Sequence, residues 1–146
     1  MRGLRLLPLL LAAAAVAAAE LPLHVDDPWI REAPPGAGVA AGYLRIHNAA
    51  AQPAMLIGAD SPQFQRIEFH ESTVRDGMSS MRRLERIEIS AGEAVALEPG
   101  GRHLMLFGKP PLPRAGDNVS LTLRFADGTV LELRVPVHAP GDAVPE

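Results

Sequence analysis

The sequence predicts an all-β protein with a single domain, built as a Greek-key β-sandwich or barrel. Three observations support this fold class. The 146 residues include 13 glycines and 14 prolines, which divide the chain into short segments. Within those segments apolar and polar residues alternate, which is the period of a strand rather than a helix. The length suits one hydrophobic core and leaves little room for a second domain.

Residues 1–19 predict a cleaved signal peptide. Two arginines near the start precede an apolar run, and Ala17 to Ala19 supply a small-residue cleavage site. The apolar run, residues 6–19, is shorter than the roughly 20 residues that a helix needs to span a bilayer. We therefore expect a mature chain beginning at Glu20, exported to the periplasm and without membrane insertion after cleavage.

Charge and composition argue against a nucleic-acid partner. The predicted signal peptide carries two of the 14 basic residues and none of the 17 acidic ones, so its removal shifts the net charge from −3 to −5. Binding to phosphates needs a basic stripe, which the sequence lacks. The chain also contains no cysteine, so a soft metal site would have to be built without thiolates.

Short alternating segments predict the strands of one domain, residues 20–138. We expect eight or nine strands, one around Ile30 and the others over residues 41–47, 54–58, 66–70, 83–89, 94–97, 102–107, 119–125 and 129–135. The segment 71–80 is polar and contains glycine, so it predicts a loop. Residues 139–146 predict a flexible tail.

The last two strands allow their register to be predicted. If Val119, Leu121 and Leu123 are to share a face with the apolar residues of the next strand, the connecting loop must have an odd length. A three-residue loop, 126–128, would pair Leu123 with Leu131 and would place Gly128 in the left-handed conformation of a G1 bulge.

Sequence motifs of common enzymes are missing. The chain has no GxSxG, HExxH, Walker loop or GxGxxG motif and no nucleophilic cysteine. We therefore expect no enzymatic activity.

Histidines and methionines stand out on the polar faces of the predicted strands. In the segment RHLMLF, His103 and Met105 leave one face while the leucines between them leave the other. In RIEFH, alternation places His70 on the face opposite Phe69. The polar segment that follows brings Met81 close in sequence to His70, and we expect this residue to act as an adjustable arm on a loop.

Two imidazoles and two thioethers form a neutral, soft set of four donors that suits Cu(I). A site saturated by four protein ligands leaves no open position for a substrate, which again argues against catalysis. Isolated histidines and methionines are usually surface or core residues. We apply that interpretation to the remaining candidates, namely His47, Met55, Met78 and His138, and expect His24 to be at most an auxiliary ligand.

The spacing of these residues resembles a known family. His70, Met81, His103 and Met105 reproduce the H-x10-M-x21-H-x-M signature of the periplasmic PCu(A)C copper chaperones. The flanking segments PWIREAPPGAGVAAGYLRIHN, GGRHLMLFG and LTLRFADGTVLELRVPV are also similar to that family. The resemblance extends from about Trp29 to Val137.

This resemblance implies a cupredoxin-like β-sandwich or barrel that binds one Cu(I) per chain through His70, Met81, His103 and Met105. It also implies that copper is delivered for assembly of the copper centres of cytochrome c oxidase, notably CuA of subunit II, in some members together with a Sco-type protein. Two features differ from the family: Glu71 stands where many members have methionine, and residues 139–146 lack the His/Met-rich tail of some members.

Other functions remain open at this stage. A copper-buffering or resistance protein of the same fold would use the same ligands, so the sequence does not distinguish storage from delivery. A structural β-sandwich without a metal is a further alternative. Cu(II) could also bind, through His70 and His103 with a water or with His24.

Overall fold

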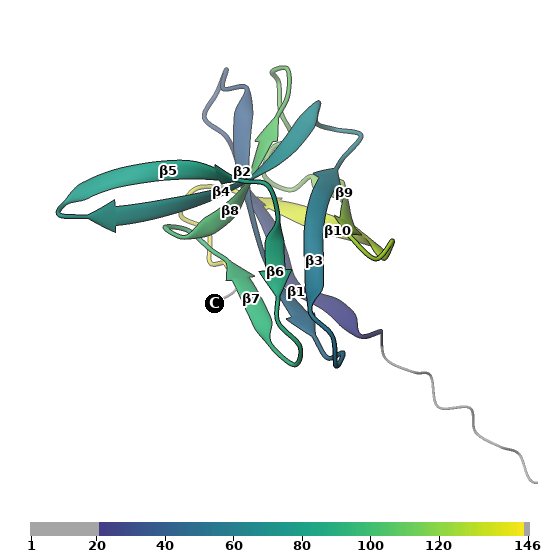
Figure 1. Cartoon of the computed structure of the whole chain (residues 1–146). Coiled ribbons are helices and arrows are strands. Elements are labelled where there is room, and N and C mark those ends of the chain that lie inside the picture. The colour runs from purple at the N-terminus through teal and green to yellow at the C-terminus, as the bar shows by residue number, and fades with distance from the viewer. Residues whose placement is uncertain (1–20, 145–146) are drawn as a thin grey trace, which may run out of the picture.

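The computed structural model describes residues 21–144, which form ten β-strands and no helix (Figure 1). The strands are β1 (Leu23–Arg31), β2 (Val39–Asn48), β3 (Ala54–Asp60), β4 (Arg66–Arg75), β5 (Met78–Leu84), β6 (Ile87–Ile89), β7 (Ala94–Leu97), β8 (Arg102–Phe107), β9 (Asn118–Phe125) and β10 (Val130–His138). Among these residues, no helix is long and apolar enough to cross a membrane. The predicted signal peptide lies outside the described residues.

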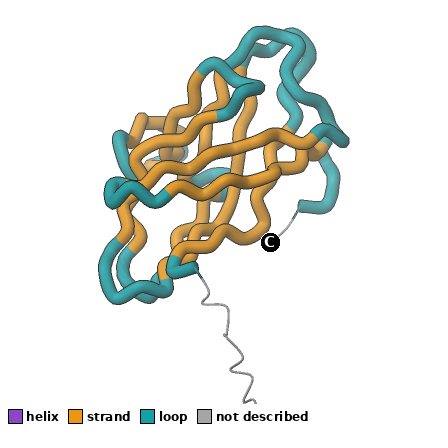
Figure 2. The backbone as a smooth tube through the Cα atoms, turned by 90° about the vertical axis from the view of Figure 1, so that its right-hand side faces the viewer, coloured by secondary structure: helices purple, strands orange, loops and turns teal. Residues whose placement is uncertain are grey.

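Two groups of strands pack around one core and are joined at an edge (Figure 2). The first group has the order β5-β4-β8-β2-β1, with β7 also paired to β2, and the second has the order β10-β9-β3-β6. A short parallel pairing of β1 with β10 joins the groups, whereas the other pairings are antiparallel. The predicted all-β, single-domain architecture is confirmed.

The core forms where the apolar faces of both groups meet. Alternation along β9 sends Val119, Leu121 and Leu123 inward, and all three are buried. On β8 the inward residues are Leu104 and Leu106, which are also buried. The leucines of the RHLMLF segment therefore anchor β8 in the core, as its alternation predicts, and leave the opposite face of this strand for polar chemistry.

The final hairpin has the predicted register. Leu131 pairs with Leu123, and Phe125 donates its backbone N–H to the carbonyl of Thr129, which leaves residues 126–128 as the loop. Gly128 has a φ of 89°, in the left-handed region that the bulged turn requires.

The predicted loop over residues 71–80 is wrong, because this segment is a β-hairpin. β4 continues to Arg75, β5 begins at Met78, and Asp76 and Gly77 form the turn with φ values of 53° and 74°. Positive φ at both central residues is the signature of a type I′ hairpin turn. The hairpin projects beyond the core (Figure 1), so both of its faces are exposed and the alternation of buried and exposed residues that marks a strand is lost.

The predicted strand over residues 83–89 is also corrected, because the chain changes sheet at Glu85 and Arg86. β5 ends at Leu84 and pairs with β4, whereas β6 begins at Ile87 and pairs with β3. The segment is predicted as one strand because Leu84, Ile87 and Ile89 all pack in or against the same core.

Asn48 closes the end of β2 and is one of the few buried polar residues, with 2% of its surface exposed. Its Nδ2 donates hydrogen bonds to the carbonyls of Gln52, at 2.8 Å, and Ile89, at 3.0 Å. Its Oδ1 accepts the backbone N–H of Ala50 at 3.0 Å. One side chain therefore satisfies backbone groups of two separate segments.

Replacing this residue tests its structural role. We expect Asn48→Ala to lower the free energy of unfolding by about 1–3 kcal/mol, because buried backbone groups lose their partners. Urea unfolding followed by circular dichroism measures the change. Asn118→Ala, at an exposed position, is the control and should change stability by less than about 0.5 kcal/mol. Equal effects of the two substitutions would contradict the assignment.

Candidate metal centre

The sequence-predicted ligands come together on three adjacent strands, with β4 in the middle. His70 of β4 pairs with His103 of β8 on one side and with Arg83 of β5 on the other. Met81 pairs with Ser72, and Met105 pairs with Glu68. Paired residues in a sheet share a face, as do residues two apart along a strand. His70, Met81, His103 and Met105 therefore all lie on one face, which we call the His/Met face.

The register places the two methionines diagonally on either side of His70. The imidazole rings of His70 and His103 have centroids 6.0 Å apart. Diagonal neighbours in an antiparallel sheet have Cα atoms about 7–8 Å apart, within reach of long side chains such as methionine. Two nitrogen donors and two sulfur donors can therefore converge above β4.

His103 is held in a defined tautomer. Its Nδ1 lies 3.0 Å from the carbonyl oxygen of Gly101, and a carbonyl only accepts hydrogen bonds, so Nδ1 carries the proton. The neutral ring then has its lone pair on Nε2. His103 is 6% exposed, and the ring of Tyr43 lies 6.5 Å from its ring, centroid to centroid.

His70 is oriented through the opposite nitrogen. Its Nε2 lies 2.8 Å from Oε2 of Glu68, whereas its Nδ1 is buried and has no hydrogen-bond partner. An imidazole that donates one N–H to a carboxylate and leaves its other nitrogen free has the arrangement typical of a metal-binding histidine. Hydrogen bonds from His70 and Arg66 lower the pKa of Glu68, which keeps this carboxyl ionised as the acceptor.

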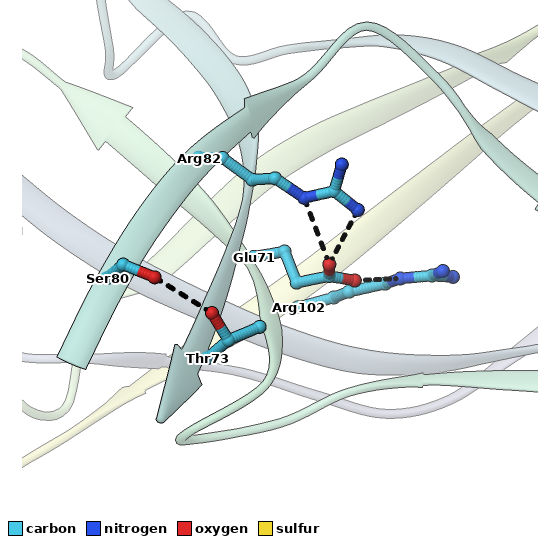
Figure 3. Close-up of polar contacts among 5 residues, drawn as sticks. All are labelled: Glu71, Thr73, Ser80, Arg82 and Arg102. Carbon is cyan, nitrogen blue, oxygen red and sulfur yellow. Dashed lines mark hydrogen bonds and ion pairs between the residues drawn. The ribbon is translucent and has the colours of Figure 1, made fainter. Parts of the chain in front are cut away.

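Glu71 stabilises the other face of the same three strands (Figure 3). Its Oε1 accepts hydrogen bonds from Nη2 of Arg82 at 2.8 Å and from Nε at 3.2 Å, and its Oε2 accepts one from Nε of Arg102 at 3.0 Å. Hydrogen bonds from Arg82 and then Arg102 lower the pKa of Glu71. Thr73 and Ser80 add a hydroxyl contact of 2.9 Å farther along the hairpin. The charged side chains of Glu71, Arg82 and Arg102 therefore link β4, β5 and β8 on the face opposite the His/Met face.

Exposure differs strongly across the four residues. His103 is buried, His70 and Met105 are half-buried, and Met81 is 55% exposed. Met81 lies on a strand of the projecting hairpin, so the expectation that it lies on a loop is wrong. Its exposure nevertheless makes it the outermost of the four.

The other histidines and methionines lie elsewhere. Met78 is 75% exposed and lies on the opposite face of β5 from Met81, because its pairing partner is Arg75. Met55 pairs with Glu88 in the second sheet, and the ring of His138 meets the edge of Trp29. His24 lies beside His47 and Asp26 on β1 and β2, a cluster that the sequence analysis did not identify. The sequence alone indicates ordinary surface or core residues at these positions, with His24 at most an auxiliary ligand, because alternation does not reveal which strands are neighbours.

Comparison with known proteins identifies the family. Residues 23–137 match the family model "LpqE-like: Putative lipoprotein LpqE-like". The chain is 35% identical over 117 residues to "Putative lipoprotein Lxx21020" of Leifsonia xyli subsp. xyli (strain CTCB07), covering 79% of this chain and 69% of the relative.

Two solved structures share the fold. The copper-bound PCuAC domain from PmoF2 has a TM-score of 0.70 and 26% identity, with 84% of this chain and 97% of that domain covered. The solution structure of CuI-DR1885 from Deinococcus radiodurans has a TM-score of 0.65 and 28% identity, with 81% of this chain and 79% of that one covered. The cupredoxin-like sandwich implied by the sequence resemblance is confirmed, and the chain belongs to the LpqE-like family, which is the PCu(A)C family that its signature resembles.

Proposed function

We propose that this protein is a periplasmic metallochaperone that binds one Cu(I) through His70, Met81, His103 and Met105. In this proposal it delivers copper for assembly of cytochrome c oxidase, at the CuA site of subunit II. The observation that carries the proposal is the placement of two imidazoles, each with a free ring nitrogen, and two thioethers on one face of three paired strands.

The chemistry of the donor set supports Cu(I) over other ions. Thioether sulfur and neutral imidazole are soft or borderline ligands, and neither brings a negative charge. Zn(II) sites use imidazole with thiolate or carboxylate, and Mg(II) and Ca(II) sites use oxygen. Two relatives of the same fold are described as copper-bound and Cu(I)-bound, which also supports copper as the cargo.

The exposure gradient supports transfer rather than permanent storage. Met81, the exposed ligand, lies on the projecting hairpin, where an acceptor can approach and displace it first. His103 stays covered beside Tyr43 and would release the ion last. We infer that copper leaves by stepwise ligand exchange with the acceptor, which is the CuA site of subunit II or a Sco-type protein acting before it. The lipoprotein names of the relatives support export of the chain.

Storage is the competing function, because a copper-buffering or resistance protein would use the same four ligands. An enzymatic role finds no support, because four protein ligands would saturate Cu(I). The two copper functions differ in whether the ion moves to an acceptor, which the last experiment of this subsection measures.

Met81 and Met78 form a matched pair for testing the site, since both are exposed methionines on β5 but lie on opposite faces. We expect Met81→Leu to lower Cu(I) affinity by about 10–100-fold in an anaerobic competition titration. Loss of a residue that only hydrogen-bonds to a metal ligand already costs that much affinity. X-ray absorption should show two sulfurs around copper in the wild type and one in the variant. Met78→Leu should change neither. Equal affinity of all three proteins would exclude Met81 as a ligand.

Glu68 tests the orientation of His70. We expect Glu68→Ala to weaken Cu(I) binding by about 10–100-fold, because the imidazole loses the acceptor that fixes its ring. The same titration measures this loss. Glu88→Ala, which removes an exposed carboxylate of β6, is the control. A normal affinity in the Glu68 variant would show that this carboxylate does not support the site.

Delivery is tested by mixing the Cu(I)-loaded protein with the apo soluble domain of oxidase subunit II under anaerobic conditions. We expect the absorption bands of the CuA centre to appear once an oxidising equivalent is supplied, because Cu(I) passes from the donor to subunit II. Copper retained entirely by the donor would favour the buffering function.

A further inference from the structure

Three metal-ligating side chains that the proposed Cu(I) site does not use lie together on β1 and β2. His24 of β1 pairs directly with His47 of β2, and their imidazole rings stack with centroids 4.5 Å apart and an angle of 1° between the ring planes. Asp26 follows His24 by two residues and so shares its face of β1. One ligand atom from each of the three residues lies within 4.8 Å of the other two.

The distances are close to those of a metal site. His47 Nε2 lies 2.8 Å from Asp26 Oδ2, and His24 Nε2 lies 3.9 Å from the same oxygen. Two ligand atoms each about 2.0 Å from one ion are about 2.8–3.3 Å apart at angles between square and tetrahedral. Rotation of the exposed His24 ring by a small amount would bring the third ligand atom into range.

His47 carries an unsatisfied ring nitrogen. Its Nε2 is buried and makes no hydrogen bond of acceptable geometry, although Asp26 Oδ2 is only 2.8 Å away. Within the described part of the chain, the ion-pair partners of Asp26 are these two histidines. A carboxylate oxygen and a buried imidazole nitrogen held side by side without a hydrogen bond form the contact that a bound cation would satisfy.

We propose that His24, Asp26 and His47 form a second metal site, which takes a divalent ion of borderline softness, Cu(II) or Zn(II). Imidazole with carboxylate suits these ions, and the lack of a thioether makes the cluster a poor site for Cu(I). Three protein ligands leave a fourth position for water. The side chains of His24 and Asp26 are 54% and 48% exposed, which leaves the ion accessible for exchange.

The second site is separate from the His/Met face. β2 pairs with β8 through Val39 to Gly42 but with β7 through Leu44 to His47, so His47 lies at the other end of the strand. From Tyr43, which packs near His103, to His47 the chain advances four residues, about 13 Å along the strand. The inference is therefore independent of the proposed Cu(I) function.

Calorimetric titration of the purified metal-free protein with Zn(II) tests the site. We expect one Zn(II) to bind. We expect His24→Ala, His47→Ala and Asp26→Asn each to weaken binding by about 100-fold or more. Loss of a residue that only hydrogen-bonds to a metal ligand already costs about 10–100-fold in affinity, and loss of the ligand itself should cost more. His138→Ala, a histidine outside the cluster, is the control and should bind normally. Unfolding temperatures measured without metal show whether each variant is folded, and His24→Ala, at an exposed position, decides the outcome if His47→Ala does not fold.

A Cu(II) titration followed by electron paramagnetic resonance forms the second arm. In protein already loaded with Cu(I), we expect Cu(II) to displace Zn(II) and to give nitrogen coupling from two imidazoles, which His24→Ala reduces to one. Zn(II) binding should persist in the protein already loaded with Cu(I). Failure of Cu(I) to bind would contradict only the proposed function, because the Zn(II) titration uses the metal-free protein. No binding of either ion, or binding that the three substitutions leave unchanged, would overturn the second site.

Discussion

The arrangement of the His/Met face depends on one constraint, the register of β4 between β8 and β5. This register sets His70 beside His103 and places Met81 and Met105 diagonally on either side. Because the side-chain period of a strand is two, a slip of one residue would turn His70 toward the core and Phe69 outward. The burial of Phe69, Leu104 and Leu106 prevents that slip. Core packing on one face of β4 therefore positions the ligands on its other face.

Beyond the core, the register is maintained by polar contacts rather than by burial. Glu71 binds Arg82 and Arg102 on the face opposite His70, so one carboxylate connects three strands where few apolar contacts are available. Isolated surface ion pairs contribute little, but a carboxylate shared by two arginines forms a small network. This explains how a projecting hairpin can hold an exposed ligand such as Met81 and still keep it in register with His70.

The two candidate metal sites differ in the softness of their ligands. The His/Met face offers sulfur and neutral nitrogen, whereas the cluster on β1 and β2 offers nitrogen and a charged oxygen. An irregularity of β1 between Asp26 and Trp29 separates the second cluster from the aromatic pair formed by Trp29 and Tyr43. Bulges of this kind redirect side chains, and here the bulge lets Asp26 and Trp29 share the outer face although they are three positions apart.

The sequence by itself determined the all-β class, the register of the last hairpin and the shared polar face of His103 and Met105, because alternation and turn chemistry are local properties. The prediction of Met81 rests on its closeness in sequence to His70 and on the spacing of the family signature, since alternation did not place it. The sequence did not determine that residues 71–80 form a hairpin, since a strand without a buried face has no hydrophobic period. Nor did it reveal Glu71 as a link between strands or His24 as the neighbour of His47. Those contacts depend on which strands pair, and strand pairing is decided only when the whole chain packs its apolar faces around one core.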